Sequence, residues 1–176
     1  KDYLHSLCSP QDPIFEDPFY FNTKISDEDG KIEGIINWFD AMEPINESYC
    51  NTIKTPMGGT HESGFKTGIF KAFKEFSKLK YEKKSSQINQ EDLFGSSASI
   101  LSVFLENPEF QGQTKEKLSS IEPGRKIESK IKILFEQWLT SKTKSAEELF
   151  LYAFNRSQLR LQNRSNQIID KNIKRK

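Results

Sequence analysis

An apolar stripe on residues 65–79 constrains the fold of this chain more than any other feature of its sequence. Its members recur every three or four residues, the spacing that places side chains on one face of an α-helix. They are Phe65, Ile69, Ala72, Phe73, Phe76 and Leu79. Such a helix is stable only when another element covers its apolar face. We therefore expect this helix to pack on an apolar layer supplied by the rest of the chain.

Four segments have the composition of β-strands, and together they can supply that layer. Residues 19–25, 32–39 and 48–53 precede the helix, and the first two flank Asp29-Gly30, a pair typical of tight hairpin turns. We expect these three strands to form an antiparallel meander. Residues 98–105 follow the helix and are apolar on both faces, which is typical of a strand in the middle of a sheet. The pattern predicts an α+β fold with a four-stranded sheet.

Local signals predict where the helices begin and end. Gly58-Gly59 lets the incoming chain turn sharply, and Thr60 is expected to cap the helix that carries the apolar stripe. A polar, lysine-rich connection over residues 81–90 should follow this helix. A second amphipathic helix is expected after the break at Pro123-Gly124, and Ser145 is expected to cap a long last helix.

The size and charge of the chain exclude several classes of protein. Its 176 residues suffice for one domain of ordinary size, and 26 Lys and Arg nearly cancel 25 Asp and Glu, which leaves a net charge of +1. No segment approaches the ~20 apolar residues that a membrane helix requires. We expect a cytoplasmic protein in which any basic surface is local. Because the first residue is Lys1 rather than Met, we also expect the chain to be part of a longer protein.

Neither a disulfide framework nor a metal site is supported by the sequence. Cys8 and Cys50 are the two cysteines, and no Cys-x-x-Cys motif is present. Residues 27–30 resemble part of a calcium-binding loop. However, matching their glycine to the sixth position of that loop places Ile25 and Ile36 at the first and twelfth ligand positions. Apolar side chains cannot bind Ca²⁺, so we expect no metal site and two reduced cysteines.

Two features are candidates for chemistry. Gln113-Thr114-Lys115 follows Gly112 in a loop, and a lysine ammonium beside an amide donor suits the terminal phosphate of a nucleotide. The chain has no Gly-x-x-x-x-Gly-Lys-Ser/Thr loop, so any nucleotide must be held mainly by another domain. His61 is either a general base or a hydrogen-bonding residue that fixes a loop. No activated Ser or Cys and no carboxylate pair accompanies it, which favours the second role.

Two rows of basic residues each permit more than one interpretation. The lysines of the first helix form either an ordinary solvated face or a path for phosphates. They are Lys66, Lys71, Lys74 and Lys78, followed by Lys80, Lys83 and Lys84. Arg156, Arg160 and Arg164 recur every four residues along the last helix. These arginines either bind nucleic acid or pair with acidic residues of a neighbouring domain.

Two motifs are specific when they are taken together. The first is Gly-Gly-Thr-His-Glu-Ser-Gly-Phe at residues 58–65, and the second is Asn-Pro-Glu-Phe-Gln-Gly-Gln-Thr-Lys-Glu-Lys-Leu at residues 107–118. With both motifs in this order, the chain resembles the second domain of the ATPase subunit of bacterial type IIA topoisomerases, the GyrB/ParE family. The resemblance extends over nearly the whole chain. Residues 110–120 and the helix with Trp138-Leu139 are more similar to ParE, the B subunit of topoisomerase IV, than to GyrB, the B subunit of gyrase.

The resemblance implies a transducer domain, which follows a GHKL-type ATP-binding domain and precedes a TOPRIM domain. Its fold would be a four-stranded mixed or antiparallel sheet with helices on one face and long C-terminal helices. It would contain a left-handed βαβ crossover, an exception to the right-handed rule. Residues 1–18 would be an extended lead-in from the ATPase domain and residues 19–142 the transducer domain. Residues 143–176 would be a long helix that leads to the TOPRIM domain.

The resemblance also implies roles for individual residues. Lys115 would contact the γ-phosphate of ATP, Gln113 would help to position it, and Gly112 and Thr114 would complete the sensor loop. The residues expected at a DNA cavity are Lys66, Lys74 and Lys78. The residues expected to shape the helix start are Gly58, Gly59, Thr60 and His61. ATP and Mg would be bound mainly by the ATPase domain, and this chain would hold no catalytic residue.

The implied function is to couple ATP binding and hydrolysis to gate movement during DNA strand passage, in decatenation and relaxation by a type II topoisomerase. The expected partners are the neighbouring ATPase and TOPRIM domains, the A subunit of the topoisomerase, a second copy of the B subunit, and double-stranded DNA. The protein would act in the bacterial cytoplasm at the nucleoid. The chain by itself would neither hydrolyse ATP nor cut DNA. The same domain of the gyrase B subunit, and a free-standing nucleic-acid-binding domain, are the alternatives.

Overall fold

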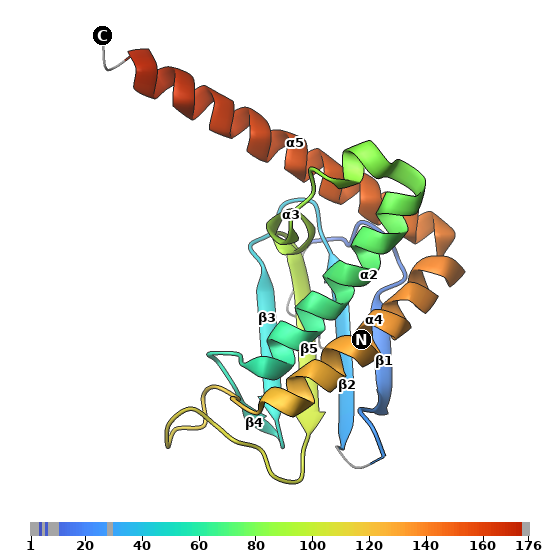
Figure 1. The fold of residues 1–176 in the computed structure, drawn as a ribbon, viewed down its shortest axis with the longest axis vertical. Coiled ribbons are helices and arrows are strands. Elements are labelled where there is room, and N and C mark those ends of the chain that lie inside the picture. Colours follow the sequence, from blue (N-terminus) through green and yellow to red (C-terminus); the bar gives the residue numbers. More distant parts are fainter. Residues whose placement is uncertain (1–3, 5, 7–10, 28–29, 174–176) are drawn as a thin grey trace.

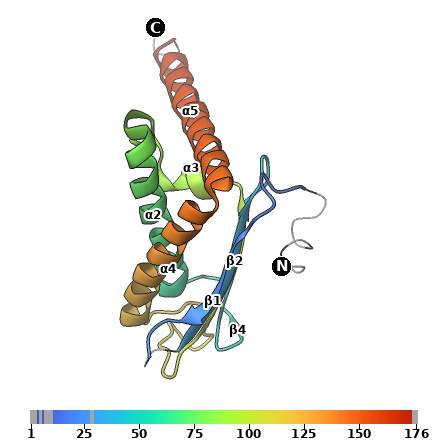
Figure 2. The ribbon, with the colours of Figure 1, turned by 90° about the vertical axis from the view of Figure 1, so that its right-hand side faces the viewer.

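The chain folds into a mixed β-sheet and helices that cover one of its faces (Figures 1 and 2). The computed structural model describes residues 4, 6, 11–27 and 30–173. The strands are β1 (Phe19–Lys24), β2 (Lys31–Trp38), β3 (Ile45–Cys50), β4 (Ile53–Lys54) and β5 (Ser97–Phe104). The principal helices are α2 (Thr60–Ser85), α3 (Gln90–Phe94), α4 (Ile121–Ser141) and α5 (Thr143–Ile173). The expected α+β class is confirmed.

The order of the strands in the sheet is β1-β2-β5-β3-β4. β2 is antiparallel to both β1 and β5, whereas β3 is parallel to β5. The expected meander of the first three strands is therefore wrong, because β5 lies between β2 and β3. β5 has buried residues on both faces of the sheet, so it gains most from neighbours on both sides. Its expected central place is confirmed, and the two-residue β4 raises the number of strands from the expected four to five.

The parallel strands β3 and β5 are connected through α2 and α3. In Figure 1, α2 lies in front of the sheet, both strands run downward, and β5 lies to the right of β3. Turning that view so that the strands point upward places β5 to the left of β3, which makes the crossover left-handed. This is the handedness that the family resemblance implies and that general topology rules would not predict.

Helices α2 and α4 run side by side over the sheet and pack with their backbones in close contact (Figures 1 and 2). A Cβ atom on Gly64 would lie 2.4 Å from the carbonyl oxygen of Gly124, and one on Gly68 would lie 2.6 Å from that of Glu128. Only glycine permits so close an approach at these two positions. Four members of the apolar stripe of α2 are buried as expected, whereas Phe76 is only partly buried and Leu79 is 89% exposed.

The structure corrects three expectations about helix ends. α4 begins at Ile121, so Pro123 stands within its first turn, where a backbone N–H has no helical partner to lose. α5 begins at Thr143, so Ser145 lies inside the helix and does not cap it. α2 continues to Ser85 through a non-helical residue at Tyr81, where a loose connection was expected. The ring of Tyr81 stacks on Phe150 of α5 with centroids 4.0 Å apart, which explains why the chain stays ordered there.

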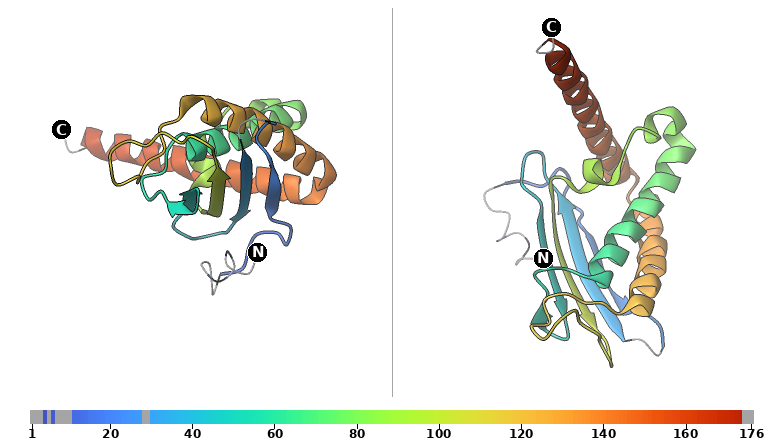
Figure 3. Two further views of the ribbon diagram at one scale, coloured as in Figure 1. Left: turned by 90° about the horizontal axis from the view of Figure 1, so that it is seen from below. Right: turned by 60° about the vertical axis from the view of Figure 1, so that its left-hand side comes forward.

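The first part of α5 packs on the domain, and the rest extends away from it (Figure 3). Ala146, Leu149, Phe150 and Ala153 are buried, whereas residues 161–167 are all exposed. Before β1, residues 11–18 have little regular structure, as expected, and Pro13 bridges to Phe39.

The hairpin of β1 and β2 is confirmed, and Gly30 has a φ of +94°. Several expected features lie at least partly outside the described residues: Cys8, the turn residue Asp29, and the end of the basic tail at residues 174–176. Within the described part of the chain, none of the helices is both long enough and apolar enough to cross a membrane.

Candidate functional site

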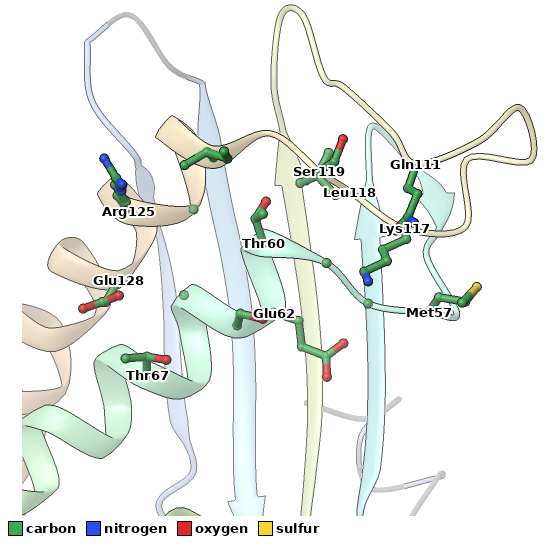
Figure 4. A pocket seen from close by; sticks show the side chains of 16 residues that line it. Met57, Thr60, Glu62, Thr67, Gln111, Lys117, Leu118, Ser119, Arg125 and Glu128 are labelled. Atoms are coloured by element: carbon green, nitrogen blue, oxygen red, sulfur yellow. The ribbon is translucent and has the colours of Figure 1, made fainter.

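The two sequence motifs meet in space at the beginning of α2. Two backbone hydrogen bonds join them: Leu118 N donates to Gly58 O at 3.1 Å, and Thr60 N donates to Leu118 O at 3.0 Å. A third bond, from Met57 N to Glu116 O at 3.0 Å, ties the residue just before the first motif to the second. We call residues 57–60 and 116–119 the loop base and residues 112–115 the loop tip. Figure 4 shows Gln111 and Lys117 beside the segment that carries Met57 and Thr60.

The two glycines of the first motif make this pairing possible. Gly59 has a φ of +140°, and a Cβ atom there would lie 2.3 Å from the oxygen and 2.6 Å from the nitrogen of Leu118. Gly58 has a φ of +66°, a left-handed conformation that favours glycine. Leu118 itself is fully buried. Gly58 and Gly59 are thus required by the loop base.

The helix-start motif begins α2 at Thr60 as expected, but Thr60 does not cap the helix. The N-cap residue is Gly59, and no side chain supplies a cap hydrogen bond. The Thr60 hydroxyl oxygen is buried and, among the described residues, has no hydrogen-bond partner. Its backbone N–H donates to Leu118 O, so the second motif supplies an acceptor for one of the N–H groups that have no partner within the helix.

His61 is fully buried below the loop base. Its Nε2 atom lies 3.1 Å from the hydroxyl of Thr55, which in turn lies 2.8 Å from that of Ser48. Burial lowers the pKa of His61 to about 4, because the low-dielectric interior penalises the charged ring. A neutral histidine without access to solvent suits a residue that fixes the loop and does not suit a general base.

The loop tip is exposed along its whole length, including Gln113 and Lys115. Gly112 has a φ of +84° and Lys115 a φ of +56°, which is uncommon for a residue with a side chain. The ammonium of Lys115 lies 6.0 Å from the ring centroid of Phe110. Below the tip, Gln111 N donates to Lys117 O at 2.9 Å, which closes the loop. The structure thus presents an amide and an ammonium to solvent on a firmly anchored loop.

The three lysines expected at a DNA cavity have three different environments. Lys66 forms an ion pair with Glu62 at 2.8 Å. Lys74 points into the protein, where its ammonium donates to the carbonyl oxygens of Ser85 and Ile88, and burial lowers its pKa. Lys78 is exposed. The structure does not bring the three ammonium groups together on one surface.

Among the three arginines of α5, Arg160 has an acidic partner that sequence reasoning missed. Its guanidinium binds both carboxylate oxygens of Asp92 in α3, each at 2.8 Å. The sequence pattern allowed a partner from a neighbouring domain, but the chain supplies its own. No local spacing signals this pair, because the two residues are 68 positions apart in the sequence. The capping box that Asn89 and Asp92 form holds Asp92 at the start of α3 but does not identify its partner.

An open groove of about 590 Å³ lies next to the loop base (Figure 4). Lys117 and Arg125 contribute positive charge to it, and Glu62 and Glu128 contribute negative charge. Glu62 is paired with Lys66, and Glu128 with Lys71. Sequence reasoning did not identify this groove, since its walls come from α2, α4 and the second motif.

Cys50 is a free cysteine, but it is not a reactive one. Cys50 is fully buried, and burial raises the pKa of its thiol to about 11, so the thiol remains protonated at neutral pH.

Comparison with known proteins places this chain among topoisomerase subunits. The family model described as DNA gyrase B matches residues 1–168. The B subunit of DNA topoisomerase 4 from Caulobacter vibrioides is 36% identical over 178 aligned residues, which cover 99% of this chain and 25% of that protein. The chain spans about a quarter of the length of the curated relatives that it matches.

Solved structures agree with this placement. The topoisomerase IV ATP-binding domain of Francisella tularensis, solved with a small-molecule inhibitor, has a TM-score of 0.75 and 29% identity, covering 84% of this chain and 41% of that one. The 43K ATPase domain of Thermus thermophilus gyrase B has a TM-score of 0.81 and 22% identity, covering 96% and 45%, and supports the fold. The family match, the relative and the shared fold together show that this chain belongs to the DNA gyrase B family.

Proposed function

We propose that this chain is the transducer domain of the B subunit of a type II DNA topoisomerase, with residues 19–142 as the domain and residues 143–176 as the helix that leaves it. Its role is to sense the γ-phosphate of ATP and to couple ATP turnover to gate movement in strand passage. The observation that carries the proposal is the exposed loop tip, which presents Gln113 and Lys115 from a firmly anchored loop base.

The geometry of the loop tip suits contact with a partner outside this chain. Lys115 holds a left-handed backbone conformation, which costs about 1 kcal/mol or more for a residue with a Cβ atom. Strain of this kind is frequent where a side chain must be aimed for function. ATP and Mg are held mainly by the neighbouring ATPase domain, and this chain adds a cation and an amide donor at the terminal phosphate.

Coupling follows from the dependence of this contact on the γ-phosphate. Lys115 gains a charge-assisted hydrogen bond only while that phosphate is present, so ATP favours the state in which the two domains are docked. Hydrolysis and release of phosphate remove the preference. The resulting rigid-body movement opens or closes a gate in a dimer of B subunits, which acts with the A subunits on double-stranded DNA.

Within the family, topoisomerase IV is our first choice, because curated relatives named as the B subunit of DNA topoisomerase 4 reach 36% and 37% identity over nearly all of this chain. The gyrase B subunit is the alternative. Reconstitution of the intact B subunit with its cognate A subunit separates the two. Decatenation without ATP-driven negative supercoiling supports topoisomerase IV, and negative supercoiling supports gyrase.

Fewer residues remain candidates for DNA contact than the sequence suggested. Lys78 is exposed and Lys66 is half-buried in an ion pair, so both remain candidates for the DNA cavity. Lys74 instead binds backbone carbonyls. The involvement of Lys74 and Arg160 in internal contacts also removes much of the support for a free-standing nucleic-acid-binding domain.

The decisive experiment replaces Lys115 in the intact topoisomerase, which contains both the B and the A subunits. Losing a charge-assisted hydrogen bond costs about 1.5–3 kcal/mol, so Lys115→Ala should lower ATP hydrolysis roughly 10- to 100-fold. Lys83→Ala removes another exposed lysine and serves as the matched control, with an unchanged rate. Near-normal ATP hydrolysis in Lys115→Ala would refute the sensor assignment.

A further inference from the structure

The ion pair between Asp92 and Arg160 has the geometry of a rigid joint. The Nε atom of Arg160 lies 2.8 Å from Oδ1 of Asp92, and its Nη2 atom lies 2.8 Å from Oδ2. The same Nη2 atom also donates to the carbonyl oxygen of Gln87 at 2.8 Å. The side chain of Asp92 is 3% exposed and that of Arg160 is 17% exposed. Two parallel hydrogen bonds fix the relative orientation of the groups as well as their distance.

Asp92 is itself held in place by α3. Its backbone N–H donates to the side chain of Asn89, and its carboxylate accepts from the N–H of Asn89, both at 2.9 Å. The carboxylate that receives Arg160 is therefore fixed to the first turn of α3. The contact with Arg160 therefore ties the orientation of this turn to α5.

A second cation connects the same region to α2. The ammonium of Lys74 donates to the carbonyl oxygens of Ser85 and Ile88, at the end of α2 and just before α3. Lys74 and Arg160 thus both bind the short segment 85–92, the first from α2 and the second from α5. Each contact is charge-assisted and at least partly removed from water, so each is stronger than an exposed ion pair.

The joint lies at the opposite end of α2 from the loop base. α2 begins at Thr60, which is bound to Leu118, and it ends at Ser85, which is bound by Lys74. Figure 1 shows α2 rising along the sheet from its start near β4 to the region where α3 and α5 meet. One helix therefore connects the anchored loop with the joint.

Arg160 also stands where α5 leaves the domain. Ser157 is fully buried, whereas all residues from 161 to 167 are exposed. The contact at Arg160 is thus among the last that hold α5 before it extends alone (Figure 3). A small change of angle at this point produces a large displacement farther along the helix.

We propose that the Asp92–Arg160 pair is the joint that transmits the state of the loop to the direction of α5. Both are positioning residues, which act through the helix they orient and touch neither nucleotide nor DNA. The proposal rests on the proposed function, since it assigns the route by which sensing at Lys115 reaches the rest of the protein.

The test uses the intact topoisomerase with both of its subunits. Arg160→Lys keeps the positive charge but loses the two-pronged contact, so Asp92 is not left as an unpaired buried charge. We expect ATP hydrolysis to stay within about twofold of wild type while strand passage per ATP hydrolysed falls about tenfold, within the usual range of coupling between sites. Lys80→Met is the matched control. It breaks the exposed Lys80–Glu147 pair, which also joins α2 to α5, and should change neither rate.

Hydrogen–deuterium exchange of residues 86–92 supplies a second readout. In the wild-type enzyme, a non-hydrolysable ATP analogue should alter exchange in this segment, and in Arg160→Lys the response should be lost. Retention of both normal coupling and the nucleotide response in Arg160→Lys would refute the joint, as would an equal fall of ATP hydrolysis and strand passage. If Lys115→Ala hydrolyses ATP normally, the sensor function fails instead, so the two failures are distinguishable.

Discussion

The loop base and the loop tip are adjacent in sequence but opposite in physical character. The base is closed by backbone hydrogen bonds and by Leu118, which is fully buried, whereas every residue of the tip is exposed. Residues that face inward are constrained by packing, and exposed polar residues on an ordered loop are free to serve recognition. The difference indicates that substitutions in the base should change stability and substitutions in the tip should change activity.

The largest expected effect on stability is at Gly59. A Cβ atom there would lie 2.3 Å from Leu118 O, so Gly59→Ala should lower the free energy of unfolding by ~3 kcal/mol or more. Gly112→Ala is the matched control, because this glycine also has a positive φ but, among the described residues, has no atom within 4 Å of the added methyl group. It should cost only about 1 kcal/mol. Urea unfolding of the 176-residue chain measures both, and equal losses would contradict the role of Leu118.

A second effect follows from the neutral state of His61. Its pKa in the folded chain is about 4, below the ordinary value of 6.5. Between these values the unfolded chain binds the proton more tightly, so the stability from this residue is complete above pH 6.5 and is lost as pH falls toward 4. At pH 5 the loss should be about 2 kcal/mol.

The measurement compares the pH dependence of unfolding in wild type and in His61→Gln. Other titrating groups contribute equally to both, so the difference in slope between pH 4 and 6.5 isolates His61. Parallel curves would show that His61 is not held neutral in the folded chain.

A smaller effect is expected at Thr55, whose hydroxyl contacts both His61 and Ser48. Thr55→Val removes the hydroxyl at nearly constant volume and leaves two buried polar groups with fewer partners, at a cost of ~1–2 kcal/mol. Thr55→Ser keeps the hydroxyl and should retain most of the stability. If the serine variant is as unstable as the valine variant, the lost methyl group is responsible and the hydrogen-bonded chain contributes little.

Local patterns predicted the secondary structure well, but they did not predict which strands are neighbours. The apolar stripe predicted α2, and strand-forming composition on either side of Asp29-Gly30 predicted β1 and β2. The order of β3 and β5 depends on contacts between residues about fifty positions apart, which no local spacing records. The expectation that Thr60 caps α2 was wrong, because Thr60 is the first residue of the helix and its N–H donates to the distant Leu118.

In the candidate site, too, the sequence predicted local features and did not predict contacts between distant residues. Residue chemistry alone singled out the Gln113-Thr114-Lys115 loop, and the family resemblance supplied its role. The pairing of the loop with Gly58 and Gly59 required the fold. For Lys74, the sequence pattern was misleading. Its spacing on α2 matches that of a solvent-exposed lysine, but the kink of the helix near Tyr81 brings two carbonyl groups within reach of its ammonium.

The smallest expected effect on stability is also the sharpest test of the contrast between base and tip. Replacing both Gln113 and Lys115 by alanine removes exposed side chains whose described surroundings consist of solvent and the ring of Phe110. The free energy of unfolding of the chain should therefore change by no more than about 0.5 kcal/mol. A loss above about 1 kcal/mol would mean that the tip packs on the domain, and Gln113 and Lys115 would then be structural residues. An unchanged unfolding curve, together with slow ATP hydrolysis by the same variant of the intact enzyme, requires that the tip acts on something outside this chain.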